Sequence, residues 1–422
     1  MKASLKRDIS TLEATTFGIG IILGAGIYAI IGPAAATAGN SLWLSFVIGA
    51  IISSFTGLSY AELSTMFPKA AAEYVFTRRA FKKEFWAFLL GWLIILTGII
   101  AASTVAIGFA GYLRSFVDVP IFIIAIILIA LLSIPNYLGI EESSKLNIIF
   151  TIIEVAGLIV IIFLGMSRFP NVDYFEAPYG FQGILAASAL VFFAYIGFED
   201  IVNIAEEMEN PIKTIPRALI LSIIFTTFFY VLIAISVVSL ANWSELGTSD
   251  APLAFAASKS LGESAFLAIS VIALFATANT VLILLIVGSR MVYGMARSGS
   301  LSKIFSKVHS KQGTPWVAVL LVMTLSMIFA SLGDLKLIAG ITNFTAFAIF
   351  ASVNFILIWL RYNEPELERP FKVPLNIGRF PLIPFLGLIS CIFLVSHLDL
   401  LAIFLGIITL SSGVLFYKLI KN

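Results

Sequence analysis

The sequence predicts an all-α integral membrane protein with twelve transmembrane helices, and three observations lead to this fold class. Hydrophobic residues make up 60% of the 422 positions and charged residues only 12%, whereas a soluble domain carries about a quarter charged residues. The charged residues are clustered, and the runs between them exceed the length of about 18 apolar residues that is typical of a membrane-spanning helix. The third observation is the distribution of lysine and arginine along these runs.

Twelve apolar segments can be placed along the chain. None shows the alternation over about ten residues that is typical of a membrane β-strand. The first of them follows a basic, polar N-terminus, and we expect a retained span there rather than a cleaved signal peptide. The expected spans are residues 12–38, 42–66, 84–113, 119–138, 145–168, 181–206, 216–241, 264–296, 315–333, 335–360, 380–397 and 399–418.

Basic residues fall almost entirely on one side of the predicted spans. With a cytoplasmic N-terminus, 22 of the 26 lysine and arginine residues lie in segments on the cytoplasmic side. Cytoplasmic loops of membrane proteins carry such an excess of positive charge. The pattern therefore predicts a multi-pass protein of the cell membrane with both termini in the cytoplasm.

Several classes of function lack their signatures in this sequence. One cysteine, Cys391, and two histidines, His309 and His397, are too few for a disulfide framework or a metal cluster. There is no Walker sequence for a nucleotide, no protease or hydrolase motif, and no basic block for nucleic acid. We therefore expect a protein of the lipid bilayer that is not an enzyme and needs no cofactor or metal; its oligomeric state is left open.

Two of the spans contain glycine where a helix is easily interrupted. The first span carries Gly24, Ala25 and Gly26 near its middle, and the sixth carries Gly197 with acidic residues just beyond it. Close helix packing is the alternative role of any one of these glycines. Interruptions at matching places in two halves of a chain indicate a transporter binding site. The open amides of one half-helix attract anions and the open carbonyls of another attract cations, so an amino acid zwitterion fits both.

Several stretches, in order along almost the whole chain, resemble the amino acid–polyamine–organocation transporter superfamily. The resemblance implies the LeuT-like fold, in which the first and sixth helices are discontinuous. Two inverted five-helix repeats (1–168 and 181–360) and two peripheral helices (380–418) would form a single transport domain that works by alternating access. The matching stretches are GIGIILGAGIY (18–28), LSYAELSTMFPKAAAEYVFTRRAF (58–81), FFAYIGFED (192–200), AEEMENPIKTIPRA (205–218), SRMVYGMARSG (289–299) and RYNEPELERPFKVP (361–374).

The same resemblance implies a substrate site made from both interrupted helices. Backbone amides of the first helix would hold the substrate carboxylate, and backbone carbonyls of the sixth would hold its ammonium group. Relatives place an aromatic residue that closes over the substrate at the position of Phe193, whereas Phe198 either lines the pocket or packs in the core. The expected site residues are Ile22, Leu23, Gly24, Ala25 and Gly26 in the first span and Phe192, Phe193, Ile196 and Phe198 in the sixth.

Glu154 is the most isolated acidic residue within a predicted span. It shares one face of the fifth helix with Asn147 and Thr151, which precede it by seven and three positions. An acid inside the membrane is a candidate functional group, because apolar surroundings make its ionisation costly. Several proton-coupled relatives carry a lysine at this level, so the resemblance implies that Glu154 takes up and releases the coupling proton. The structural alternative is a protonated Glu154 that bonds a carbonyl across helices.

Two further acids lie near the cytoplasmic ends of their spans. Glu199 matches an acid that relatives use as an inner gate or pH-sensitive element, and alternatively it caps backbone amides freed by the break. Glu62 is expected in a structural ion pair, with Arg290 or Arg297 as its partner.

The eighth span carries a short polar stretch. Thr277, Asn279 and Thr280 either hold helices together or, from their place in the family pattern, line the site or an ion pathway. Because their hydroxyl groups could help to bind sodium, sodium remains an alternative to the proton as the coupling ion.

The sequence thus predicts a secondary active transporter of amino acids. Proton-coupled uptake or exchange of neutral amino acids is favoured, because no acid lies firmly on the spans expected to line the side-chain pocket. A cationic amino acid or polyamine antiporter, with Glu199 or Glu154 as the counter-charge, is the alternative within transport. A membrane receptor that senses amino acids without net transport is the alternative of another class.

Overall fold

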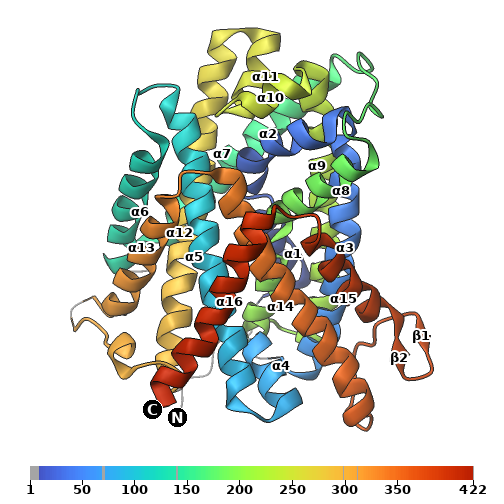
Figure 1. Ribbon diagram of the computed structural model, residues 1–422, viewed down its shortest axis with the longest axis vertical. Helices are drawn as coiled ribbons and strands as arrows, with labels where there is room; N and C mark the ends of the chain where they lie inside the picture. Colours follow the sequence, from blue (N-terminus) through green and yellow to red (C-terminus); the bar gives the residue numbers. More distant parts are fainter. Residues whose placement is uncertain (1–8, 69–71, 139–140, 298, 311, 422) are drawn as a thin grey trace.

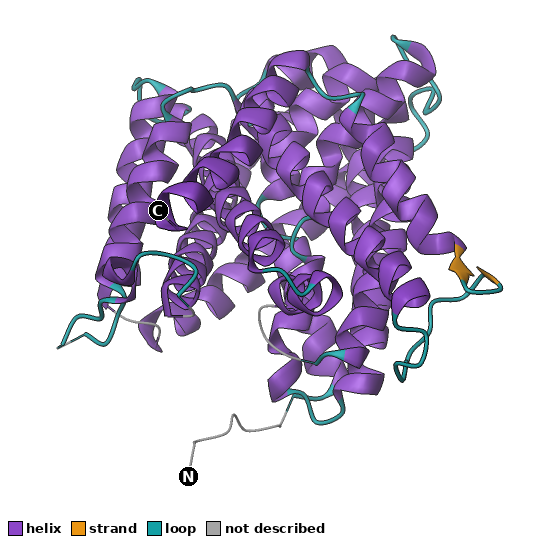
Figure 2. Cartoon of the chain, turned by 60° about the horizontal axis from the view of Figure 1, so that its bottom comes forward, coloured by secondary structure: helices purple, strands orange, loops and turns teal. Residues whose placement is uncertain are grey.

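Helices make up nearly all of the structure, a computed structural model that describes residues 9–421 except 69–71, 139–140, 298 and 311. Figure 2 shows one small hairpin among the helices, and it is the only sheet in the described ranges. Its strands β1 (Asn376–Ile377) and β2 (Phe380–Pro381) pair antiparallel. Gly378 permits the tight turn between them, because its φ of +62° is open to glycine and rarely to other residues.

Long apolar helices form the body of the molecule (Figure 1). Within the described residues, eight helical segments are long and apolar enough to cross a membrane, and four shorter apolar helices accompany them. The prediction of an all-α architecture suited to a membrane is therefore confirmed. Six of the eight segments are single helices: α5 (Glu84–Arg114), α6 (Ile121–Leu138), α9 (Pro211–Leu240), α12 (Glu263–Arg297), α14 (Leu335–Asn363) and α16 (Leu400–Lys421). The other two are residues 26–66, which end with α3 (Leu42–Met66), and residues 180–202 of the sixth predicted span. The helices α7 (Glu141–Met166), α13 (Trp316–Ala330) and α15 (Leu382–Val395) accompany them.

Local sequence explains where several helices begin. The side chain of Asn210 accepts a hydrogen bond from the amide of Lys213, and Pro211 occupies the first turn of α9, where its missing N–H costs nothing. Asp334 caps α14 in the same way by accepting from the amide of Leu337 at 3.0 Å. These caps satisfy amides that have no partner inside a helix.

Two of the predicted spans are interrupted, as the glycines predicted. The first consists of α1 (Thr11–Ile22) and α2 (Gly26–Ala38), with a short 3₁₀ turn, η1 (Gly39–Ser41), after α2. The sixth begins as α8 (Gly180–Val191), tightens into the 3₁₀ segment η2 (Phe192–Tyr195), and resumes as the 3₁₀ segment η3 (Phe198–Glu207). Between η2 and η3 the chain is extended at Ile196 and left-handed at Gly197.

Short helices lie at the two ends of the molecule in Figure 1. At one end, α10 (Trp243–Thr248) and α11 (Pro252–Leu261) pack on α2. A β-carbon added at Gly32 would lie 2.8 Å from the carbonyl oxygen of Leu246, so this packing is close. The opposite end carries α4 (Ala72–Phe81) and, after α12, the 3₁₀ segment η4 (Lys303–Ser306). We refer to these two ends as the α10–α11 end and the α4 end.

The arrangement of α9 positions the candidate site. This helix packs against α1, α3 and α7, while α12 packs against α5 and α7. Side chains of α9, α7 and α12 can therefore reach the interrupted helices from different sides.

Candidate functional site

The two helix breaks lie against each other. A β-carbon added at Gly26 would lie 2.8 Å from the Cα of Ala194 in η2, so only glycine allows α2 to approach this closely. On the other side of the break, Gly197 has a φ of +117° and leaves no room for a side chain next to Ile21. The structure thus brings together the first-span and sixth-span positions that the sequence singled out.

Tyr230 of α9 joins the ends of both interrupted helices. Its hydroxyl group lies within hydrogen-bond distance of the carbonyl oxygen of Ile22, the last residue of α1. The same hydroxyl lies 2.7 Å from the carbonyl oxygen of Ala194 in η2. A tyrosine has a single hydroxyl hydrogen, so the two carbonyl oxygens have more acceptor capacity than Tyr230 can satisfy.

The first turn of α2 presents backbone amides at the break. The amide of Ala25 donates to the Thr280 hydroxyl of α12 at 3.1 Å. Within the described part of the chain, no residue accepts a hydrogen bond from the amides of Gly24, Gly26 or Ile27. Amides at a helix start carry partial positive charge and are suited to an anion.

The aromatic residues of the sixth span separate into two groups. The ring of Phe192 packs on Phe347 with a centroid distance of 4.7 Å, and Phe198 packs on Phe350 at 5.2 Å. Both rings are therefore part of the core against α14, which is the packing alternative for Phe198. Phe193 is buried, and Ile196 is partly exposed at the extended residue of the break.

Glu154 lies in α7, where α7 faces α2. Its side chain is only 2% exposed, and its Oε1 atom has no hydrogen-bond partner among the described residues. The hydroxyl of Tyr28 in α2 donates to the backbone carbonyl of Glu154 at 2.9 Å. The carboxyl group also lies within electrostatic range of the Tyr28 and Tyr230 hydroxyls. The side chains of Asn147 and Thr151, expected on the same face, are outside the described part of the structure.

Glu199 binds the backbone at the second break. Its Oε2 atom accepts a hydrogen bond from the amide of Gly197 at 2.9 Å. This is the capping contact that the sequence suggested as one of two roles. The contact holds the carboxyl group at the start of η3, beside the left-handed turn.

The polar residues of the eighth span differ in their distance from the break. Thr280 reaches it directly through the amide of Ala25. The hydroxyl of Thr277 instead donates within its own helix, to the carbonyl of Ala273 at 2.6 Å, and both Thr277 and Asn279 are buried. The structure therefore connects Thr280 to the break by a hydrogen bond. Among the described residues, no group of three or more histidine, cysteine or acidic side chains is arranged to hold a metal ion.

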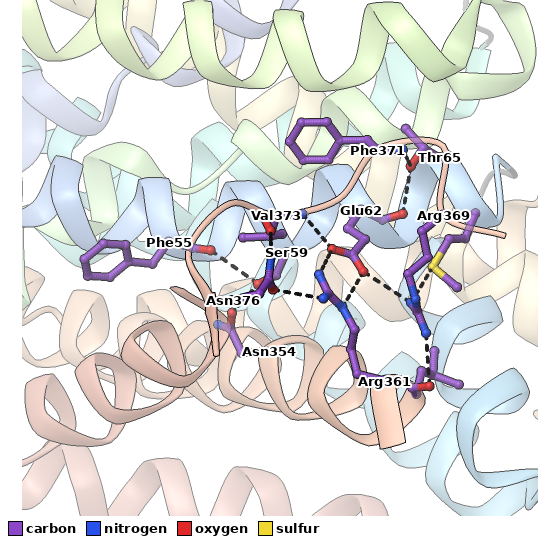
Figure 3. Close-up of polar contacts among 12 residues, drawn as sticks. Phe55, Ser59, Glu62, Thr65, Asn354, Arg361, Arg369, Phe371, Val373 and Asn376 are labelled. Atoms are coloured by element: carbon purple, nitrogen blue, oxygen red, sulfur yellow. Dashed lines mark hydrogen bonds and ion pairs between the residues drawn. The ribbon is translucent and has the colours of Figure 1, made fainter. Parts of the chain in front are cut away.

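Glu62 forms a buried ion-pair network at the α4 end (Figure 3). The expected ion pair exists, but the expectation of Arg290 or Arg297 as partner is wrong. The two guanidinium groups belong to Arg361 and Arg369, and Glu62 itself is fully buried. The partners come from the end of α14 and the loop after it, because this loop folds back over the last turns of α3.

Sequence reasoning missed the tyrosines that organise the site. Tyr230 lies in the seventh span, and Tyr28 lies two residues beyond Gly26. Tyr112 of α5 supports this arrangement by donating to the backbone carbonyl of Tyr28 at 3.1 Å. The sequence does contain one indication of these tyrosines: each places a phenol hydroxyl within an apolar span, and a buried hydroxyl requires a hydrogen-bond partner. Which carbonyl it would meet depended on the fold.

Comparisons with known proteins show transporters as relatives of this chain. The branched-chain amino acid permease BcaP of Bacillus subtilis is 32% identical, over 99% of this chain and 93% of its own length. The methylthioribose transporter of the same organism is 28% identical over 99% and 94%. Cationic amino acid transporter 4 of Mus musculus is 31% identical over 86% of this chain and 61% of the relative. The profile of the amino acid permease family matches residues 9–419. The chain therefore belongs to the amino acid permease family, within the amino acid–polyamine–organocation superfamily.

Proposed function

We propose that this protein is a secondary active transporter that carries amino acids across the cell membrane by alternating access. The interrupted helices would be the first and sixth of twelve spans. These spans would form two inverted repeats (residues 1–168 and 181–360) and two peripheral helices (380–418), with both termini in the cytoplasm. Family membership and the long apolar helices support this arrangement.

The observation that carries the proposal is the meeting of both breaks at the Tyr230 hydroxyl. Ile22 and Ala194 direct their carbonyl oxygens to this one group. An ammonium group has three hydrogens to donate, so it could satisfy the acceptor capacity that one hydroxyl leaves over. The amides of Gly24 and Gly26 at the start of α2 would bind the carboxylate. Both charged ends of an amino acid would thus bind backbone groups of the breaks.

Neutral amino acids fit the described surroundings of the breaks better than cationic ones. Glu199 is the acid nearest to the sixth-span break, and it is already bonded to the amide of Gly197. A relative named for branched-chain amino acids also supports an apolar substrate. A cationic substrate is the second candidate, because one oxygen of Glu154 has no partner among the described residues and a relative is named for cationic amino acids.

Proton coupling would depend on Glu154. A buried carboxyl group without a cationic partner is costly to ionise, so it would hold its proton until water reaches it. Tyr28 connects the Glu154 backbone to α2. Loss of the proton would therefore place a negative charge near the amides that bind the substrate carboxylate. Sodium remains the alternative coupling ion, with Thr280 as the hydroxyl nearest the break.

The experiment is uptake of labelled neutral and cationic amino acids by proteoliposomes, with pH and sodium gradients applied separately. We expect accumulation of neutral amino acids driven by an inward proton gradient. Binding without flux of any substrate would instead identify a receptor. Accumulation that follows only a sodium gradient would refute proton coupling.

Substituting Glu154 with glutamine separates binding from coupling. We expect Glu154→Gln to bind and exchange substrate but to lose accumulation driven by the proton gradient. Glu364→Gln is the matched control, because it removes a carboxylate that pairs with Arg79 and Lys82 at the α4 end. Normal proton-driven accumulation by Glu154→Gln would disprove its role in coupling.

A further inference from the structure

We propose that Glu73 in α4 is a second protonation site, and that its charge state controls how firmly α4 and η3 pack at the α4 end. The inference builds on the proposed transport function. It adds to that function a pH-dependent control that is separate from the coupling proton at Glu154.

The buried carboxyl group of Glu73 accepts a hydrogen bond from a tyrosine of α3. Its side chain is 4% exposed, and its Oε1 atom accepts from the Tyr60 hydroxyl of α3 at 2.9 Å. Tyr60 is fully buried. A carboxyl group in this position has lost most of its water and has gained a neutral donor; no ion pair joins it to a cation within the described ranges.

Ring contacts lead from this hydrogen bond to the break in the sixth span. The Tyr60 ring packs edge-on against Phe198 and against Phe350, each at a centroid distance of 6.0 Å. Phe198 is the first residue of η3 and directly follows Gly197. Because Tyr60 contacts both Glu73 and η3, a weaker contact at Glu73 would also weaken the packing of Phe198, the first residue after the break.

The carboxyl groups that face Glu73 come from η3. The charge of Asp200 interacts electrostatically with Glu73, and the charges of Glu199 and Asp200 both interact with Tyr60. An ionised Glu73 would therefore be a further negative charge beside these two acids. A protonated Glu73 would remove that repulsion.

Three cations that follow Glu73 in the sequence pair with other acids. Arg79 of α4 and Lys82, which follows α4, pair with Glu364 at the end of α14, at 3.2 and 3.3 Å. Arg78 pairs with Glu84 at the start of α5, at 3.9 Å. The acids of α5 and α14 at this end are thus bonded to the exposed side of α4, away from the buried Glu73.

These surroundings place the titration of Glu73 near neutral pH. The pKa of Glu73 is raised to about 7, chiefly by burial. Hydrogen bonds from its own backbone amide and from Tyr60 lower this pKa, and the charge of Asp200 raises it. The ionised fraction then rises from about one tenth at pH 6 to about nine tenths at pH 8. At low pH, α4, Tyr60 and η3 would pack firmly against one another. At mildly alkaline pH this packing would be weaker.

The test is substrate exchange in proteoliposomes with equal pH on both sides, measured from pH 5.5 to 8.5. Without a gradient, coupling does not drive the flux. We expect the wild-type exchange rate to rise several-fold between pH 6 and 8. Glu73→Gln should exchange at the slow rate across this range, because it keeps the neutral, packed form. Tyr60→Phe should move the midpoint to higher pH, because it removes the hydrogen bond that favours the ionised carboxylate.

Glu84→Gln is the control, since it removes an acid at the same end that lies outside the cluster. If Glu73→Gln retains the wild-type pH profile, the rise in exchange rate between pH 6 and 8 belongs to another titrating group and the proposal is wrong. A second measurement does not need transport: the melting temperature of the purified protein should fall as pH rises to about 7 in the wild type and much less in Glu73→Gln. A protein that shows this difference but no exchange would contradict the proposed function and leave the protonation site standing. Equal melting profiles would overturn the site itself.

Discussion

Replacing Glu62 with alanine should destabilise the protein strongly, because two buried guanidinium groups would lose their counter-charge. Glu62 accepts from the Nε and Nη2 atoms of Arg361, from Arg369 Nη1 at 3.2 Å, and from the amide of Val373 at 2.8 Å. The side chains of Arg361 and Arg369 are 4% and 9% exposed. Water cannot easily replace the carboxylate at this depth.

The size of the effect follows from burial. Removing one partner of a buried ion pair costs about 3–5 kcal/mol, mostly because the remaining charge is left uncompensated. Glu364 provides a matched comparison, since its partners Arg79 and Lys82 are 47% and 72% exposed. Exposed pairs contribute roughly 0–1 kcal/mol. Glu62→Ala should therefore cost several times more than Glu364→Ala.

The assay is thermal unfolding of the purified protein in detergent, with wild type, both single variants and the double variant Glu62→Ala/Arg361→Met measured side by side. Removing both charges should be less harmful than removing Glu62 alone, because the buried Arg361 charge is no longer unpaired. Equal losses for Glu62→Ala and Glu364→Ala would refute the argument from burial. A double variant less stable than Glu62→Ala would refute the argument from unpaired charge.

Three further variants test the site and the protonation of Glu73. Tyr230→Phe should keep the fold but weaken substrate binding about tenfold, because the carbonyl oxygens of Ile22 and Ala194 would lose the hydroxyl that holds them together for the ammonium group. A buried hydrogen bond of roughly 1–1.5 kcal/mol corresponds to such a factor; ligand-induced stabilisation measures the affinity, and unchanged affinity would remove Tyr230 from the site. Gly197→Ala should cost about 1–3 kcal/mol of stability through its positive φ and lower the exchange rate, whereas wild-type stability would show that the turn relaxes easily. For Glu73, the pKa of about 7 in the folded protein lies above the ordinary value of 4.5, so its favourable contribution to stability is complete below about pH 4.5 and lost as pH rises through 7. Chemical unfolding should show the wild type losing up to about 3 kcal/mol relative to Glu73→Gln across that window, and parallel pH profiles would contradict it.

The breaks could be predicted from sequence because they have a local cause. Glycine at positions 24, 26 and 197 lowers the cost of leaving the helix, and the left-handed φ of Gly197 requires such a residue. The isolation of Glu154 was also visible, since the apolar run around it is a property of the chain itself. Local composition therefore predicted where the helices open and which acid lies among apolar neighbours.

The partners of these groups could not be predicted, because they depend on contacts between distant segments. Arg361 lies 299 residues beyond Glu62, and Tyr230 lies 208 residues beyond Ile22. Many arginines and tyrosines in the sequence are equally able to supply a guanidinium or hydroxyl group. Which of them reaches the acid or the carbonyl is decided by how the helices pack, and choosing Arg290 or Arg297 for Glu62 failed for this reason.

The role of each buried acid follows from the charge of its partners. Glu62 lies between two guanidinium groups, so losing its charge would leave two cations exposed to an apolar interior, and the acid holds the α4 end together. Glu73 has a neutral phenol and nearby acids, which makes either charge state accessible near neutral pH. Glu154 has an oxygen with no partner among the described residues and lies where α7 meets α2. Of the three, Glu154 alone lies beside the breaks, and within the described part of the chain its Oε1 atom accepts no hydrogen bond. A proton bound there would be released only when the helices around the breaks move and admit water, and this link between movement and proton release is what a coupled transporter requires.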